Sequence, residues 1–214
     1  NKSLYTGTMT DISSLSQWLG SGSINIFGMP YAGKDTQGHL LAEQLDGHLL
    51  GGGEILRGST ITPAGRAAME AGELFPTQEY INTVLPYLSR DEFAGKPLIL
   101  SSVGRWHGEE AGVLQACEQS GHPVRAVIFL NLKESVVYER WEIAQSAGGR
   151  DNRADDEKDK LAVRLVEFRD KTLPVIEYYR DQGLLIEIDA SQHVIDVTRD
   201  IVDALTKLAA RPTN

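Results

Sequence analysis

Short apolar runs alternate along the chain with longer stretches in which apolar residues recur at helical spacing. Strands are predicted at Ile24–Phe27, His48–Leu50, Leu98–Ser102, Ala126–Leu132 and Leu184–Ile188. The central runs, Leu98–Leu100 and Val127–Leu130, are apolar throughout, as expected of strands that helices cover on both faces. The pattern therefore predicts an α/β fold of three layers, in which a five-stranded parallel sheet lies between helices.

Two parts of the chain depart from this alternation. Residues 1–23 precede the first strand and are interpreted as an N-terminal extension, with a short helix at Asp11–Leu19 and a Gly-Ser linker at residues 20–23. Residues 51–90 are mostly helical, with Gly and Pro breaks, and are long for a single crossover. They are predicted to form a small inserted subdomain within one domain that spans residues 24–214.

Charge and composition narrow the classes of partner. The chain has 21 basic and 30 acidic side chains and a net charge of −9, which disfavours nucleic acids and anionic membrane surfaces. No apolar run approaches the roughly 20 residues that cross a bilayer. Cys117 is the only cysteine, so no internal disulfide is possible, and it is expected to be a buried helix residue rather than a nucleophile. These features predict a cytoplasmic protein, and we expect a monomer.

The segment Gly28–Lys34 has the pattern Gly-x4-Gly-Lys of a phosphate-binding P-loop. It follows a predicted strand and opens an amphipathic helix in which Leu40, Leu41 and Leu45 share a face. Backbone N–H groups, the helix dipole and Lys34 would together favour a phosphate at this point. The alternative is a tight strand-to-helix turn that needs glycine and leaves Lys34 exposed, and the context disfavours it. The predicted fold is therefore of the P-loop NTPase type.

Several segments, in this order, resemble the adenylate kinase family. Residues 28–37 resemble the family's Gly-x-Pro-Gly-x-Gly-Lys-Gly-Thr-Gln, and residues 53–57 resemble its Gly-Asp-Met-Leu-Arg. Further similar segments are residues 70–76, residues 100–105, the Arg-x-Asp-Asp and Arg-Leu-x-x-Phe pair at residues 153–168, and residues 173–190. The resemblance covers about residue 24 to the C-terminus. The segments are individually degenerate, but they are specific as an ordered set.

The resemblance implies a nucleoside monophosphate kinase that transfers the γ-phosphoryl group of ATP to a nucleoside monophosphate, with Mg²⁺ as the cofactor of ATP. The implied ATP-binding residues are Gly28, Pro30, Tyr31, Ala32, Gly33, Lys34, Asp35, Thr36 and Arg140. The implied catalytic residues are Lys34, Arg105, Arg140, Arg153 and Arg164. The implied acceptor-binding residues are Gly52, Arg57, Phe75, Arg105 and Glu109. Residues 141–152 are expected to form a short lid.

The arginines suit this chemistry, because each guanidinium group can bind two phosphate oxygens. Arg153 and Arg164 lie eleven residues apart, about three helical turns, so a helix would place them on nearly one face. A solvated charged helix, with the acidic residues at 155–159 as partners, is the alternative for Arg164. The family has a further arginine four residues after Arg140, where this chain has Ala144, and Arg150 is a candidate to replace it.

Two departures from the family pattern concern the metal. Ser101 replaces the aspartate that ends the central strand, and Asp35 stands where a P-loop usually has the Ser or Thr that contacts magnesium. Thr36 follows one residue later, as it does in the family. We expect Asp35 and Thr36 to lie on the magnesium side of the loop, and one hypothesis is that Asp35, with Glu54, replaces the missing acid. The alternative is that Asp35 only caps the P-loop helix.

Two further departures concern the acceptor. Gly52 replaces a threonine that contacts the acceptor base, and Glu109 replaces the glutamine that reads adenine. An ionised carboxylate is acceptor-only, so it suits guanine, which presents two adjacent donors. The alternative is that Glu109 simply begins a helix at Glu109–Gln119. AMP is therefore the nominal acceptor, and GMP is the specific alternative.

Two other functions remain open from the sequence. The changes at Ser101 and Asp35 allow a nucleotide-binding module with weakened catalysis. A P-loop kinase for a small non-nucleotide acceptor is also possible, although Arg57 and the segment Gly72–Pro76 argue against it.

Overall fold

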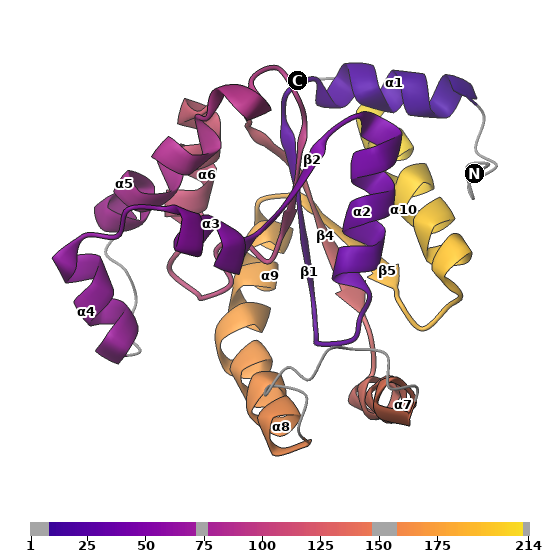
Figure 1. Ribbon diagram of the computed structural model, residues 1–214. Helices are drawn as coiled ribbons and strands as arrows, with labels where there is room; N and C mark the ends of the chain where they lie inside the picture. The colour runs from indigo at the N-terminus through magenta and orange to yellow at the C-terminus, as the bar shows by residue number, and fades with distance from the viewer. Residues whose placement is uncertain (1–8, 72–76, 147–157, 212–214) are drawn as a thin grey trace.

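The computed structural model describes residues 9–71, 77–146 and 158–211. A single parallel sheet has the strand order β2-β3-β1-β4-β5 (Figure 1). The strands are β1 (Ser23–Gly28), β2 (His48–Gly51), β3 (Leu98–Ser101), β4 (Val124–Asn131) and β5 (Leu185–Asp189). All five predicted strands are confirmed, with bounds that differ by at most two residues.

Helices cover both faces of the sheet, so the predicted three-layer fold is confirmed (Figure 1). The helices α1 (Met9–Leu19), α2 (Lys34–Leu45) and α10 (Val194–Ala209) lie together on one face. The helices α6 (Glu110–Gln119) and α9 (Leu173–Asp181) lie on the other. The remaining elements are α3 (Gly52–Gly58), α4 (Pro63–Ala71), α5 (Thr77–Leu88), the 3₁₀-helix η1 (Asp91–Phe93), α7 (Glu134–Ser146), α8 (Lys158–Glu167) and the π-helix η2 (Phe168–Thr172).

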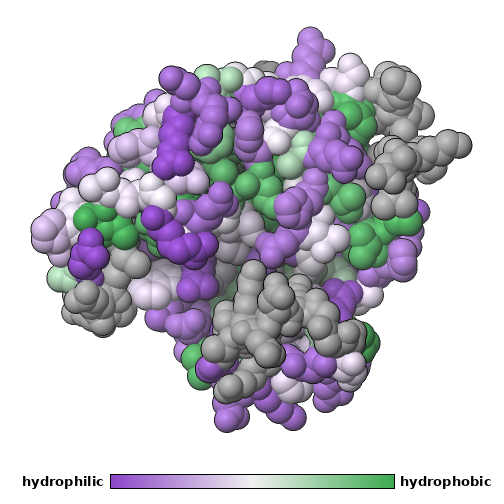
Figure 2. Space-filling model, viewed as in Figure 1, coloured by the Kyte–Doolittle hydropathy of each residue, from purple (hydrophilic) through white to green (hydrophobic). Residues whose placement is uncertain are grey.

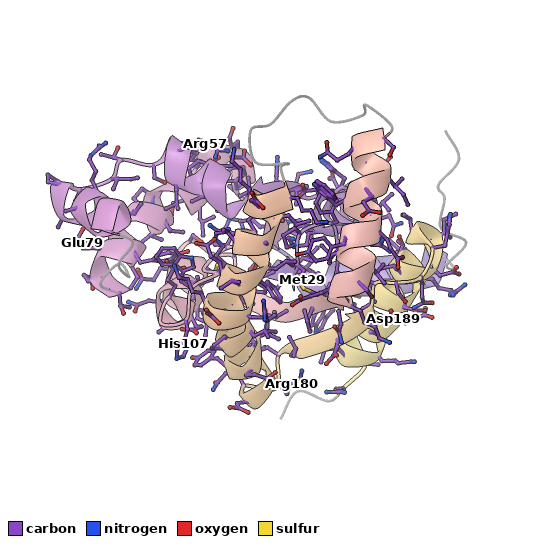
Figure 3. All side chains as sticks on the ribbon, turned by 90° about the horizontal axis from the view of Figure 1, so that it is seen from below. Met29, Arg57, Glu79, His107, Arg180 and Asp189 are labelled. Atoms are coloured by element: carbon purple, nitrogen blue, oxygen red, sulfur yellow. The ribbon has the colours of Figure 1, made fainter. Side chains whose placement is uncertain are left out.

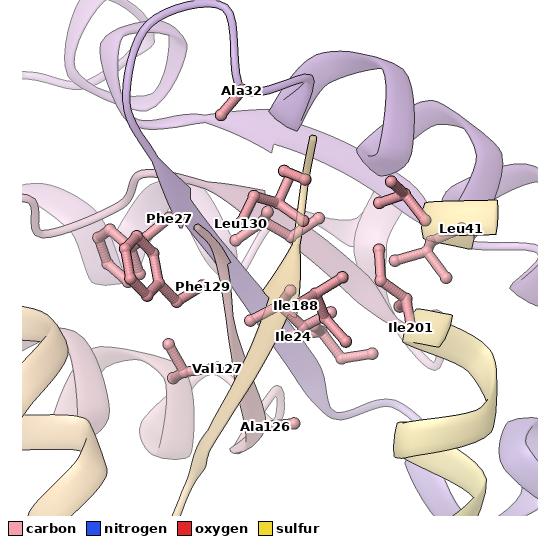
Figure 4. Packing of buried hydrophobic residues seen from close by; sticks show 14 of the residues in the cluster. Ile24, Phe27, Ala32, Leu41, Ala126, Val127, Phe129, Leu130, Ile188 and Ile201 are labelled. Carbon is pink, nitrogen blue, oxygen red and sulfur yellow. The ribbon is translucent and has the colours of Figure 1, made fainter. Parts of the chain in front are cut away.

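The core follows from the alternation of side chains along the buried strands (Figure 4). Phe27 of β1 pairs with Phe129 of β4, and both rings point to one face of the sheet. Leu130 points to the opposite face, where it packs near Leu41 of α2 and Ile201 of α10. Every residue of β3 is buried, which explains why an apolar run, rather than an alternating one, marks this strand.

The segment before β1 is part of the packed structure. The predicted helix near the N-terminus is confirmed as α1, which buries Leu15 and Leu19 completely against the core that α10 also covers. The predicted linker is wrong, because residues 20–23 form a tight turn. In this turn the Gly22 N–H donates to Leu19, and the Ser23 N–H donates to Pro123 as β1 begins. Whether residues 1–23 form a separate extension remains a prediction.

A second cluster of buried residues lies under α3, α5 and α6. It joins Ile55 of α3 and Tyr80 of α5 to Val113 and Cys117 of α6 and to the edge of the sheet at β2 and β3. Cys117 is fully buried within its helix, as predicted. The helices between β2 and β3 therefore pack on the sheet through a core of their own. The bounds 51–90 for an inserted subdomain remain a prediction.

The face of the molecule seen in Figure 2 is mostly polar. Figure 2 shows polar and charged residues spread over this face, with small apolar areas between them. Within residues 9–71, 77–146 and 158–211, no helix combines the length and the apolar character needed to cross a membrane.

Candidate active site

The P-loop lies where β1 ends and α2 begins. Figure 3 looks towards this end of the sheet, with Met29 near the centre and Arg57 and Asp189 to either side. Gly33 is the residue before α2 and has φ 92°, a left-handed conformation that glycine adopts without strain. Tyr31 has φ 64°, although it is not a glycine. It occupies the position of a family glycine, so the backbone keeps the left-handed shape at a cost of about 1 kcal/mol or more.

Lys34 reaches back into this loop. Its Nζ donates to the carbonyl oxygens of Gly28 at 2.8 Å and Met29 at 3.0 Å. The pKa of Lys34 is lowered to about 8, mainly by burial; the charge of the adjacent Asp35 opposes this shift, and the charges of Arg164 and Arg105 add to it. The structure therefore brings together three of the predicted catalytic side chains, from α2, α8 and the loop after β3.

A cavity of about 60 Å³, here called the phosphate cavity, opens beside the P-loop. Its walls include Gly28, Pro30, Lys34, Arg105, Trp106 and Arg164. Three positive side chains and one acidic side chain, Glu167, therefore face one small space next to backbone N–H groups at a helix N-terminus. This arrangement is suited to a bound anion such as a phosphate chain.

A larger cavity of about 380 Å³, here called the base pocket, lies between α3, α5 and the loop after β3. Its walls include Gly52, Ile55, Tyr80, Val84, Trp106 and Glu109. The volume lies within the range of small-molecule sites, and the lining is largely apolar with a few polar groups. Ser102, Arg105 and Trp106 line both cavities, so the two spaces meet at Arg105.

Glu109 is the acidic group of the base pocket. It precedes α6, so the helix predicted at Glu109–Gln119 is confirmed to within one residue. Its Oε2 accepts the Trp106 N–H at 3.1 Å. Burial raises the pKa of Glu109 to about 7; the Trp106 N–H and Arg105 oppose this shift, and Glu110 adds to it. At neutral pH this carboxyl group is therefore divided between its acid and its ionised forms.

The replacement of threonine by Gly52 has a steric reason. A Cβ atom at Gly52 would lie 2.7 Å from the carbonyl oxygen of Ser102, closer than side chains approach. Ser102 has φ 53° at the position of another family glycine, and its N–H donates to Ile26 of β1. The close approach of these two backbones excludes a larger residue at position 52.

The two residues expected on the magnesium side of the loop lie in the first turn of α2. Asp35 Oδ1 accepts a hydrogen bond from the Ser101 hydroxyl at 3.4 Å, across from the end of β3, and Thr36 follows Asp35 in the same turn. Carboxylate and hydroxyl oxygens are hard ligands that fit Mg²⁺, which is usually held by one or two protein carboxylates and substrate phosphates. Among the described residues no cluster of three acidic, His or Cys side chains forms a complete metal cage.

Glu54 does not join this group. Its Oε2 accepts the Gly51 N–H at 3.3 Å, and its Oε1 lies 3.5 Å from the hydroxyl of Tyr87. Both contacts belong to α3 and its packing on α5. The hypothesis that adds Glu54 to the metal site therefore has no support in these contacts.

Two of the predicted arginines, Arg140 and Arg57, do not line the phosphate cavity. Arg140 of α7 donates to the carbonyl oxygens of Tyr31 at 3.1 Å and Ala190 at 2.7 Å, so it ties the P-loop to the end of β5. Arg57 is exposed at the end of α3, and its guanidinium group lies close to Gly53, outside the linings of both cavities. Of the other predicted residues, Phe75, Arg150 and Arg153 lie outside the described part of the chain.

Three residues of the site were not predicted. Asn25 of β1 is fully buried and makes two hydrogen bonds with the backbone of Val103. Its Nδ2 donates to the Val103 carbonyl oxygen at 2.8 Å, and its Oδ1 accepts the Val103 N–H at 3.3 Å. It fixes the loop that carries Arg105, and its signal in the sequence is one polar residue within an apolar run. Trp106 separates the two cavities, under the ammonium group of Lys171 at 3.9 Å from its ring centroid.

The third unpredicted residue, Thr172, is the last of η2. Its hydroxyl donates to the carbonyl oxygen of Arg105 at 2.9 Å, and the carbonyl of Lys171 accepts the His107 N–H at 2.9 Å. The π-helix thus holds the loop after β3 at a second point, in addition to Asn25. No sequence signal marks it, because a π-helix has no characteristic residue pattern.

Comparisons with known proteins agree with this geometry. The family model for adenylate kinase matches residues 26–184. An adenylate kinase of Salinispora tropica is 32% identical over 209 residues, which cover 84% of this chain and 96% of that protein. An adenylate kinase of Xylella fastidiosa is 31% identical, with 84% and 97% covered, and one of Dehalococcoides mccartyi is 27% identical, with 86% and 97% covered. With its P-loop, its cluster of positive side chains and these relatives, the chain belongs to the adenylate kinase family of ATP-dependent phosphotransferases.

Proposed function

We propose that this phosphotransferase moves the γ-phosphoryl group of ATP to AMP, and that GMP competes as acceptor when Glu109 is ionised. The observation that carries the proposal is the junction of the two cavities at Arg105. A nucleoside monophosphate with its base in the base pocket would direct its phosphate through this junction towards the P-loop. Arg105 would then hold the acceptor phosphate where the transferred group arrives.

The donor side would be formed by the P-loop. Lys34 and Arg164 would stabilise the charge on the transferring phosphoryl group, and Arg140 and Arg153 would complete the donor clamp. Thr36 and Asp35, together with the phosphates, would hold the magnesium ion, which would supply positive charge next to the phosphate chain. Transfer would be direct, without a covalent intermediate on the protein, and closure of the lid would exclude water that could otherwise hydrolyse ATP.

Glu109 would read the acceptor base, and its protonation would set the choice. The protonated carboxyl group has one O–H donor and one carbonyl acceptor, so it presents to adenine the same pattern as the amide of glutamine. The ionised carboxylate presents two acceptors, which match the N1–H and amino group of guanine. The groups that face it are Tyr80 from α5, Arg105 and the Trp106 N–H from the loop, and Glu110 from α6.

A coupled assay of ADP formation tests the proposal, with ATP and each nucleoside monophosphate in turn, with and without Mg²⁺. AMP should be the best acceptor at pH 6–7, with turnover that depends on Mg²⁺. If ATP binds but no monophosphate accepts a phosphoryl group, the chain is a nucleotide-binding module, as the change at Ser101 would allow. If pyrimidine monophosphates are preferred at every pH, the assignment of Glu109 to the base is wrong.

A further inference from the structure

The two residues that depart from the family pattern near the metal contact each other. The family has glycine after the P-loop lysine and aspartate at the end of the central strand, whereas this chain has Asp35 and Ser101. The structure joins the Ser101 hydroxyl to Asp35 Oδ1 at 3.4 Å, although the residues lie 66 positions apart in the sequence. The chain therefore has a carboxylate on α2, opposite the end of β3, in place of the family's carboxylate at the strand end.

Ser101 provides a fixed anchor for this contact. It is the last residue of β3, only 9% exposed, and its backbone pairs with Ile26 of β1 and Gly51 of β2. The next residue, Ser102, is also tied to β1 through the bond from its N–H to Ile26. The backbone of Ser101 is therefore fixed, and its hydroxyl reaches the Asp35 carboxylate through a long hydrogen bond of 3.4 Å.

The position of Asp35 is suited to a metal on the phosphates of ATP. It directly follows Lys34, whose Nζ lies against the P-loop carbonyls, and its charge acts on that lysine. The carboxylate is exposed to solvent at the open end of the site. Within the described residues Ser101 is its only hydrogen-bond partner, so the second carboxylate oxygen has no partner there.

A role as a helix cap does not explain the direction of the Asp35 side chain. Gly33 precedes α2, and that helix has no side-chain cap. An acid in the first turn would favour the helix dipole in any rotamer that keeps it near the turn. The observed rotamer instead directs Oδ1 across the site to the strand end. Helix stabilisation does not require this direction, which places the carboxylate between the P-loop and the strand end.

We propose that Asp35, oriented by Ser101, supplies the protein carboxylate for the magnesium ion of MgATP, directly or through a bound water. Compared with the family pattern, the carboxylate then lies on the helix α2 instead of the strand β3, and the metal still has one protein carboxylate. The inference rests on the proposed use of MgATP as the donor, and it does not depend on which monophosphate accepts the phosphoryl group.

The test measures ATP affinity by calorimetry, without any acceptor, in EDTA and in excess Mg²⁺. The ratio of the two dissociation constants reports the contribution of the metal. Asp35→Asn should reduce this ratio at least about tenfold, while ATP affinity in EDTA stays equal or improves, because a negative charge beside the phosphates has been removed. Binding of Mn²⁺ to the ATP complex, followed by electron paramagnetic resonance, should weaken in parallel.

A swap of the two residues makes the test specific. Ser101→Asp combined with Asp35→Gly recreates the family arrangement and should restore the magnesium ratio that Asp35→Gly alone loses. Asp196→Asn, which removes an acid from the first turn of α10, is the matched control and should leave the ratio unchanged. An unchanged ratio in Asp35→Asn, accompanied by a lower free energy of unfolding without nucleotide, would assign Asp35 to helix capping and overturn the proposal.

Discussion

Replacing Glu109 with glutamine removes a titrating group from the base pocket while keeping its shape. Burial raises the pKa of Glu109 to about 7, so about nine-tenths of the wild-type chain carries the acid form at pH 6 and about one-tenth at pH 8. The acid form matches adenine, and the ionised form matches guanine. The wild type should therefore change its acceptor preference across this pH range, whereas Glu109→Gln should not.

The size of the change follows from the hydrogen bonds. A buried lone pair that faces another lone pair costs roughly 1–3 kcal/mol, which is about 5- to 150-fold in affinity. The population of the acid form falls about tenfold between pH 6 and pH 8, and that of the ionised form rises about tenfold. From pH 6 to pH 8, the ratio of kcat/KM for AMP to that for GMP should therefore decrease by a factor of about ten to a hundred in the wild type. The mismatch energy sets the upper limit of this decrease.

The assay is coupled ADP formation at saturating MgATP, at pH 6, 7 and 8, with each acceptor. Both acceptors carry the same phosphate, which titrates near pH 6, so its effect cancels in the ratio. Glu118→Gln makes the same charge change at an exposed position of α6 and should behave as the wild type. If the wild-type ratio is constant with pH, or if it varies equally in Glu109→Gln, Glu109 does not read the base.

Three further predictions concern the other parts of the site. Lys34→Ala should keep the fold, checked by circular dichroism, and lose at least about a hundredfold in turnover, because a preorganised charge at the phosphoryl group is removed; normal turnover would exclude the P-loop from the mechanism. Arg105→Ala should raise the KM of the acceptor far more than the KM of ATP, and equal changes in both would place this arginine on the donor side. Asn25→Ala should lower the free energy of unfolding by about 1–3 kcal/mol in urea titrations, because it leaves the buried backbone groups of Val103 unpaired. A variant as stable as the wild type would show that Asn25 does not hold this loop.

The sequence was sufficient for the parts of the fold that depend on local pattern. The central runs of β3 and β4 are apolar because helices cover both faces of the sheet, and the P-loop is marked by glycines and a lysine at fixed spacing. The linker predicted at residues 20–23 is wrong because Gly and Ser are typical of both linkers and tight turns. A tight turn is distinguished from a linker here by the contact of α1 with the core through Leu15 and Leu19, which the sequence pattern does not encode.

The rest of the site depends on contacts between distant segments. The bond from Ser101 to Asp35 and the exchange between Asn25 and Val103 join residues that are more than 60 positions apart. No periodicity encodes such pairs. Arg57 illustrates the same limit, because the family pattern names the residue while its exposed position at the end of α3 depends on how the helices pack.

The π-helix at residues 168–172 makes the site sensitive to chain length. A π-helical turn is wider than an α-helical turn and accommodates one more residue. Deleting Asp170, which is exposed, would convert this turn to α-helix and remove the wide turn from which Lys171 and Thr172 contact the loop that carries Arg105. The loop would then lose this support while every side chain of the active site remained in the sequence. The number of residues between Arg164 and Thr172 therefore matters for function, and insertions or deletions in this segment should be less tolerated than most substitutions.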